Sequence, residues 1–213
     1  MYPQLLHKKR FFKYHKSAFP KALDNKDALF LGQGSFTQCF YNPGEDFVYL
    51  RSCNNLLESI DLFTDFTDED HIHVPRVERL NTESLEYVKW YKMEKLETLR
   101  GDNLKLIRKF IKQVRNVVFN PDRYKFNNAI LQLIETHYPQ FYPSIEELSY
   151  RAQDWDSKYR FEFITCNIMQ RSDGTIVFND IIVVNYDFDT HVKIHKLPFE
   201  RLVEYTKARP YDC

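Results

Sequence analysis

The sequence contains few of the residues that mark several classes of protein. Glycine occurs only 5 times in 213 residues, which excludes a collagen-like or low-complexity chain. The 4 cysteines form no C-x-x-C pair, and their spacing suits neither a zinc ribbon nor a disulfide-rich scaffold. No apolar run approaches about 20 residues, and the first residues lack the apolar core of a signal peptide. We therefore expect no membrane association, reduced thiols and an intracellular protein.

Net charge is also lacking, since 30 lysines and arginines balance 30 aspartates and glutamates. This balance disfavours a globally basic nucleic-acid-binding protein. The charge is nevertheless uneven, because residues 1–26 carry 7 basic side chains and a single acid, Asp24. This basic arm also contains aromatic residues and leaves contact with nucleic acid open. The alternative is a cationic helix that packs its aromatic side chains on the rest of the domain.

Aromatic residues are abundant, with 18 Phe, 14 Tyr and 2 Trp, and they indicate a substantial core. The first half of the chain has the pattern of a β-rich unit with one helix, at residues 54–66. A turn is predicted at Asn42-Pro43-Gly44-Glu45. Strands are predicted at residues 28–31, 36–41, 47–51, 74–80 and 85–94.

The second half has the apolar periodicity of helices at residues 102–118 and 122–138. The motif Ser144-x-x-Glu147 is typical of a capping box and predicts the start of a third helix. Residues 161–164 and 168–169 are interpreted as strand or loop elements. A turn at Ser172-Asp173-Gly174 precedes a predicted strand at residues 175–184. The order of elements therefore predicts an α+β protein whose β-rich part comes first.

The segment Gly32-Gln33-Gly34 is a candidate phosphate-binding loop, because glycines allow backbone N–H groups to approach phosphate oxygens. It follows one predicted strand and leads into another, which disfavours a dinucleotide-binding fingerprint. It also lacks the G-K-[ST] ending of a P-loop.

Two polar residues in the second half of the chain form a second candidate site. Asp180 interrupts an apolar strand, where a carboxylate is costly unless it binds a cation or forms hydrogen bonds. With Asn167 it would provide the oxygen ligands that suit Mg²⁺, although it could instead be a turn aspartate paired with a nearby base. His71 and His73 alternate along the chain without an evident third ligand, so we expect an exposed loop there rather than a metal site.

Together these segments resemble the protein-kinase fold and, more narrowly, the small serine/threonine-kinase-like proteins of tailed bacteriophages. The resemblance extends over about residues 29–184. It implies a two-lobed α+β fold with a basic arm at 1–27, a β-rich N-lobe at 28–97 and a reduced helical C-lobe at 98–213. It rests on short segments in a given order: Leu31–Thr37, Leu50–Cys53, Val74–Glu78, Tyr91–Glu94, Phe161–Ile168 and Asp180.

The resemblance also implies sites for ATP and Mg²⁺. Asn167 and Asp180 would hold the metal, and Glu162 would orient the acceptor hydroxyl. Gly32 and Gly34 would form the loop that covers the phosphates, and Ser35 lies in the same loop. Arg51 would neutralise the phosphate charge, and Glu58 would pair with the basic residue of the third strand. Met93-Glu94-Lys95 would lie near the hinge that holds adenine. That nucleotide site consists of Gly32, Gly34, Ser35, Arg51, Glu58, Met93 and Glu94.

The chain departs from the kinase pattern at several of these positions. Glu162 stands where kinases have the catalytic aspartate, and isoleucines follow Asp180 in place of Phe-Gly. The lysine of the third strand is missing. Either Arg51 replaces it, or Leu50 occupies its place and the function of the lysine is lost. Arg51 itself could contact phosphate or be a solvated charge on an edge strand. Two hypotheses follow for a protein of the host cytoplasm: a phage-encoded kinase that phosphorylates Ser/Thr of host proteins, or a pseudokinase that binds and modulates a host protein.

Overall fold

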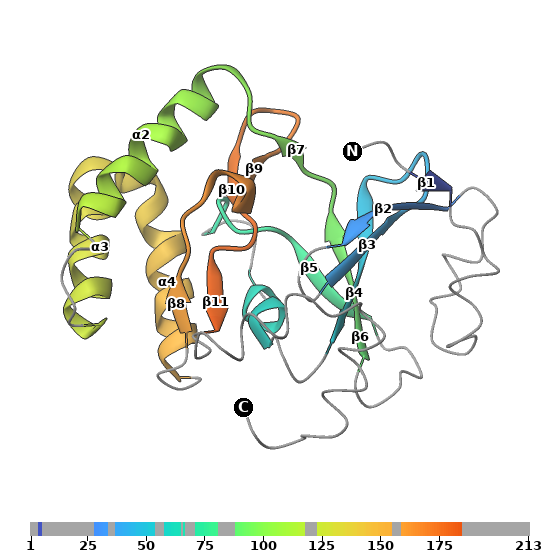
Figure 1. Ribbon diagram of the computed structural model, residues 1–213, viewed down its shortest axis with the longest axis horizontal. Helices are drawn as coiled ribbons and strands as arrows, with labels where there is room; N and C mark the ends of the chain where they lie inside the picture. The colour runs from blue at the N-terminus through green and yellow to red at the C-terminus, as the bar shows by residue number, and fades with distance from the viewer. Residues whose placement is uncertain are drawn as a thin grey trace. The chain divides into compact units, whose positions relative to one another are not determined.

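The computed structural model describes residues 4–5, 28–33, 37–53, 58–64, 66, 71–80, 88–117, 123–154 and 159–184. These residues form helices and antiparallel sheets, which confirms the α+β class (Figure 1). They belong to two compact units. Unit 1 contains the described residues up to Thr64 together with Val77–Lys95, and unit 2 contains those within Asp65–Arg76 and those from Leu96 onward. No helix in the described ranges combines the length and apolarity needed to cross a bilayer.

Unit 1 is built on one antiparallel sheet. A tight turn joins β3 to β4, with Glu45 N–H donating to the Asn42 carbonyl over 3.2 Å and Gly44 at φ 93°. A side chain is disfavoured at such a positive φ, so glycine suits this position. The strand order is β1 (Gln4–Leu5), β2 (Leu29–Gln33), β3 (Thr37–Tyr41), β4 (Phe47–Cys53), β6 (Val88–Glu94), β5 (Val77–Leu80).

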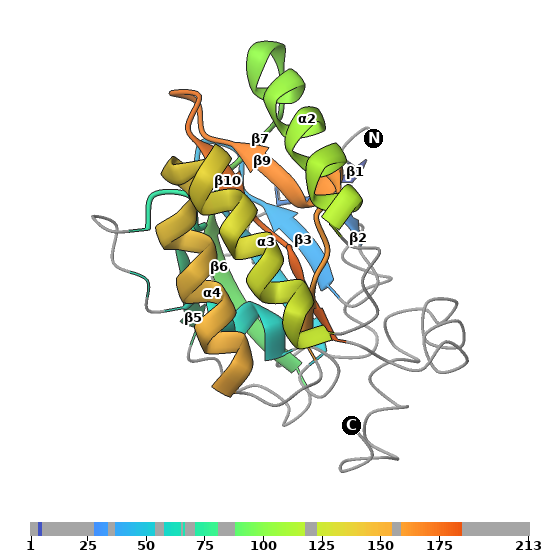
Figure 2. The ribbon, with the colours of Figure 1, turned by 90° about the vertical axis from the view of Figure 1, so that its left-hand side faces the viewer.

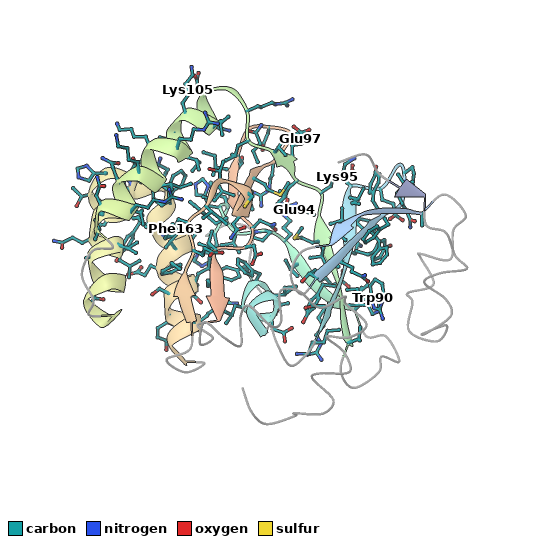
Figure 3. The ribbon with its side chains drawn as sticks, in the orientation of Figure 1. Trp90, Glu94, Lys95, Glu97, Lys105 and Phe163 are labelled. Atoms are coloured by element: carbon teal, nitrogen blue, oxygen red, sulfur yellow. The ribbon has the colours of Figure 1, made fainter. Side chains whose placement is uncertain are left out.

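The two faces of this sheet are both packed. Successive residues of β4 point to opposite faces. Leu50 lies opposite Tyr91 and belongs to a buried cluster against which Ile60 of the 3₁₀ helix η2 (Glu58–Phe63) packs. Arg51 lies opposite Trp90 on the other face, and both side chains are buried. Figure 3 labels Trp90 on the sheet.

Unit 2 combines helices with two small antiparallel sheets (Figure 2). One sheet has the order β10-β9-β7 and the other pairs β11 with β8. Helices α3 and α4 pack side by side. The elements are β7 (Glu97–Thr98), α2 (Gly101–Val117), α3 (Arg123–His137), η3 (Pro139–Phe141), α4 (Tyr142–Asp154), β8 (Tyr159–Phe161), η4 (Thr165–Asn167), β9 (Ile168–Gln170), β10 (Ile176–Phe178) and β11 (Ile182–Val184).

An aromatic cluster forms the core of unit 2. Phe110 of α2 is fully buried, and its ring centroid lies 5.1 Å from that of Tyr138 and 6.0 Å from that of Phe141. It also lies 5.1 Å from Phe163, which is labelled in Figure 3, and 6.0 Å from Phe178. The cluster therefore joins α2 to η3, to the loop after β8 and to the end of β10.

The segment Asp65–Arg76 belongs to unit 2, whereas the sequence places it in the N-lobe. His73 Nδ1 lies 2.7 Å from the Ile176 carbonyl oxygen, and Phe178 N–H donates to the His73 carbonyl over 2.8 Å. Arg171 donates to the carbonyls of Ile72 and Val74. The expectation of an exposed histidine pair is wrong for His73, which is 7% exposed. Its burial lowers the pKa of the imidazole, against the opposing hydrogen bond to Ile176.

Two other sequence predictions differ from the structure. Helix α4 begins at Tyr142, so Ser144 lies inside the first turn and is buried instead of capping the helix. Pro143 favours this earlier start because proline is well tolerated in the first turn of a helix. The single strand expected at residues 175–184 is divided into β10 and β11, which belong to different sheets. The chain changes from unit 1 to unit 2 between Lys95 and Leu96.

Candidate functional site

The pairing of β8 with β11 positions two carboxylates of unit 2. Phe161 lies opposite Ile182 in this pair, and Glu162 N–H donates to the Ile181 carbonyl over 2.7 Å. Glu162 therefore begins the loop that leaves β8, and Asp180 lies two residues before the start of β11. The antiparallel register brings these two chain positions, 18 residues apart, to the same end of the two strands.

Asn167 connects both carboxylate residues. Its backbone carbonyl accepts hydrogen bonds from Asn179 N–H over 3.0 Å and from Asp180 N–H over 3.1 Å. Its side-chain Nδ2 donates to Glu162 Oε2 over 3.3 Å. The Asn167 N–H in turn donates to the Ile164 carbonyl over 3.1 Å, within the turn that carries η4. The structure thus brings together Glu162, Asn167 and Asp180, as the sequence predicts.

The electrostatics of this site favour a bound cation. Desolvation by the surrounding protein, and after it the negative charge of Glu162, raise the pKa of Asp180 to about 6, although Asp180 is an exposed residue. Two carboxylates that repel each other in this way are stabilised by a cation between them.

The donor set also fits Mg²⁺, which prefers carboxylate and amide oxygens. Because Asn167 Nδ2 donates to Glu162, the amide oxygen Oδ1 lies on the other side of the group. It accepts a hydrogen bond from the Cys166 thiol over 3.6 Å and has a second lone pair for a cation. A cation site of this kind would keep several waters, since the protein supplies few ligands. Among the residues the structure describes, no group of three or more His, Cys, Asp or Glu side chains is arranged to hold a metal.

We expect Asp180 to titrate near pH 6 in the metal-free protein, and the substitution Glu162→Gln to lower this pKa because it removes a neighbouring negative charge. Between the ordinary aspartate pKa and about 6, the native state binds more protons than the unfolded chain, so its stability falls as pH rises through this window. Carbon-detected NMR of the carboxyl group measures the titration. An unchanged Asp180 pKa in the Glu162→Gln variant would contradict the coupling.

The nucleotide-binding positions predicted for the N-lobe lie in unit 1. Gly32 is in β2 opposite Cys39, next to an irregularity in the strand register. Met93 is 8% exposed and packs in the core cluster, and Glu94 is the last residue of β6. Gly34 and Ser35 lie outside the described residues, as does the side chain of Glu58, whose backbone begins η2.

Arg51 does not lie where either prediction places it. Its side chain is 2% exposed and donates a hydrogen bond to Gln38 Oε1 over 3.3 Å. Strand β4 is internal to the sheet, between β3 and β6, so Arg51 is neither a solvated charge on an edge strand nor a cation open to phosphate. Leu50 instead occupies the face of β4 on which η2 packs, so that face of the strand lacks a basic residue at this position.

A polar network between η2 and β6 is not predicted from the sequence. Asp61 accepts hydrogen bonds from Lys89 Nζ over 2.5 Å and from the Tyr91 hydroxyl over 2.6 Å. The Lys89 and Asp61 side chains are 13% and 12% exposed. An acid on the predicted helix and a Lys-x-Tyr pair on one face of a strand are the only sequence signals for it. This network connects η2 to the sheet through a lysine of β6, whereas the kinase resemblance leads us to expect a basic residue on β4.

Comparisons with models of known families, with curated proteins and with solved structures find no significant match to this chain.

Proposed function

We propose that this protein is an ATP- and Mg²⁺-dependent phosphotransferase with a kinase-like two-lobed fold, and that it phosphorylates Ser/Thr hydroxyls of host proteins. The observation that supports this best is the hydrogen-bonded arrangement of Glu162, Asn167 and Asp180. The kinase resemblance assigns these positions to the acceptor-orienting carboxylate and the two metal ligands. Their proximity arises from strand pairing and from one shared backbone carbonyl, so the backbone positions of the three residues are fixed before any ligand binds.

Each side chain has a separate role in this proposal. Asp180 and the Asn167 amide oxygen would hold Mg²⁺, which would neutralise charge on the phosphates. The hydrogen bond from Asn167 Nδ2 orients the Glu162 carboxylate. Glu162 would accept the proton of the acceptor hydroxyl. At the same time the hydroxyl oxygen would form a bond to the γ-phosphorus, and the bond between that phosphorus and the ADP oxygen would break. ADP and the phosphorylated acceptor are the products.

A catalytically weak pseudokinase is the second candidate, and the position of Arg51 favours it. With Arg51 buried against Gln38, and Leu50 on the opposite face of β4, this strand presents no accessible cation at either position. A missing phosphate-neutralising cation removes part of the charge stabilisation that phosphoryl transfer requires. In this alternative the protein would bind a nucleotide or a host protein without efficient turnover.

Transfer of label from γ-labelled ATP to proteins of a bacterial lysate tests the proposal. The wild-type chain should show Mg²⁺-dependent transfer, and Glu162→Gln should reduce it by about 10²-fold or more, because general-base catalysis contributes on that order. Glu146→Gln provides the matched control. Glu146 is an exposed glutamate of α4 that accepts a hydrogen bond from the Tyr142 hydroxyl, and its variant should retain wild-type transfer.

The same experiment distinguishes the two candidates when it is combined with thermal melting. A rise in melting temperature on addition of ATP and Mg²⁺, without label transfer, would contradict the kinase proposal and support the pseudokinase. If neither a rise nor transfer is detected, the nucleotide-binding assignment as a whole is wrong. Transfer that persists in Glu162→Gln would reject the role given to Glu162.

A further inference from the structure

The outward face of α2 concentrates positive charge in a chain of zero net charge. All of the exposed residues of this helix are glycine, charged or amide residues. One of them, Asp102, is acidic and pairs with Lys105 over 2.8 Å. We define the α2 basic face as the five exposed cations of the helix, Lys105, Arg108, Lys109, Lys112 and Arg115.

Helix geometry places these cations on one side. With about 100° of rotation per residue, the five positions fall within an arc of about 120° and extend over about 15 Å. The opposite side of the helix carries the buried Ile107, Phe110, Ile111 and Val114. Figure 3 shows Lys105 pointing away from the other helices of unit 2.

This face is poorly neutralised by the described part of the protein. Within that part of the chain, Lys105 is the one member of the α2 basic face in an ion pair, and its side chain is still 80% exposed. Like charges at spacings of three and four residues, such as Arg108 with Lys112, destabilise a helix by mutual repulsion. A bound polyanion would relieve this repulsion.

We propose that the α2 basic face binds the phosphate backbone of a nucleic acid without reading its sequence. The chemistry of the face favours this partner over other anions. A membrane-surface helix needs an apolar face to insert, but the apolar side of α2 is buried in the core of unit 2. An acidic protein partner would be expected to bind through aromatic or apolar anchors, and the exposed residues of α2 include neither.

Nucleic acid requires no such anchor. Its dense row of phosphates binds closely spaced cations through release of counterions, largely without regard to sequence. This inference does not depend on the proposed phosphotransferase activity, since no residue of the Glu162–Asn167–Asp180 site contributes to the α2 basic face.

Fluorescence anisotropy with a labelled mixed-sequence duplex DNA of about 20 base pairs tests the proposal in the full-length protein. The triple variant Arg108→Gln/Lys112→Gln/Arg115→Gln should bind at least about tenfold more weakly than wild type near physiological salt. Three lost phosphate contacts should also reduce the slope of log K against log salt by about 2.7, at about 0.9 per contact. The basic arm at residues 1–26 is present in both proteins, so the difference reports on α2.

The control is a triple variant with the same change in charge elsewhere, Arg76→Gln/Arg79→Gln/Lys92→Gln, which should retain the wild-type slope. Equal loss in both triple variants would overturn the proposal, since net charge alone would then explain the binding. An unchanged slope in the α2 variant would also overturn it. Polyglutamate and anionic vesicles serve as competing probes. If the α2 triple variant loses binding to either of them but keeps wild-type binding to the duplex, nucleic acid is rejected as the partner.

Discussion

Replacing Asp180 with alanine is expected to reduce ATP-dependent label transfer by about 10³-fold or more. The proposed metal ion contributes several kcal/mol of charge stabilisation in the transition state, and each 1.4 kcal/mol or so corresponds to about a tenfold change in rate. In the proposed metal site Asp180 would supply a carboxylate, whereas Asn167 would supply a neutral oxygen. Initial rates of label transfer at saturating ATP and Mg²⁺ measure the effect.

Asp102→Ala is the matched control for this substitution. Asp102 is an aspartate of unit 2 whose side chain is 95% exposed, and its loss should leave transfer unchanged. The variant Asp180→Asn preserves side-chain size and a polar oxygen, so a comparable loss of activity in a protein with wild-type melting behaviour would separate chemistry from folding. Full activity in both Asp180 variants would contradict the metal site and, with it, the proposed function.

The second large effect is expected from Phe110→Ala, which should lower the free energy of unfolding by about 3–5 kcal/mol. The Phe110 side chain is fully buried and contacts Tyr138, Phe141, Phe163 and Phe178. Truncation removes the transfer free energy of the ring and leaves a cavity that neighbouring rings fill only in part. Urea unfolding followed by tryptophan fluorescence and circular dichroism measures the change.

The outcome of Phe110→Ala also affects the candidate site, because Phe163 lies within the loop that contains Glu162 and Asn167. Tyr150→Ala is the control, since Tyr150 is 62% exposed on α4 and should change stability by no more than about 0.5 kcal/mol. Similar losses in the two variants would show that the aromatic cluster does not carry the stability of unit 2. A loss in Phe110→Ala well below 3 kcal/mol or so would indicate that the neighbouring rings collapse into the space.

The proximity of Asn167 and Asp180 is predictable from the sequence, whereas the hydrogen bonds that connect them are not. The turn at Ser172-Asp173-Gly174 reverses the chain between them, so the two residues must return to the same end of the hairpin. The Asn167 carbonyl accepts hydrogen bonds from Asn179 and Asp180 just after β10, and the chain then continues into a different sheet. These hydrogen bonds depend on three-dimensional geometry that no local pattern encodes. Strand periodicity alone therefore predicts one strand where two are present.

The sequence could not determine the environment of Arg51 because both faces of the unit 1 sheet are buried. Alternation along β4 places Arg51 and Leu50 on opposite faces of the sheet, but an arginine in a strand is normally assigned to the solvent side. The Asp61–Lys89 pair was equally hidden, since its members are separated by 28 residues and each resembles an ordinary surface charge. Such long-range polar contacts arise only when the helix and sheet have been assembled.

The path of the chain limits how this protein can be divided. It enters unit 2 at Asp65, returns to unit 1 at Val77 and leaves again after Lys95. A fragment that begins at Leu96 would lack the His73 carbonyl that receives Phe178 N–H, and the carbonyls of Ile72 and Val74 that receive Arg171. Proteolysis within this segment would therefore remove support from the hairpin beside the candidate site. To express unit 2 by itself, residues 71–76 would have to be kept and joined by a linker to residue 96 in place of residues 77–95.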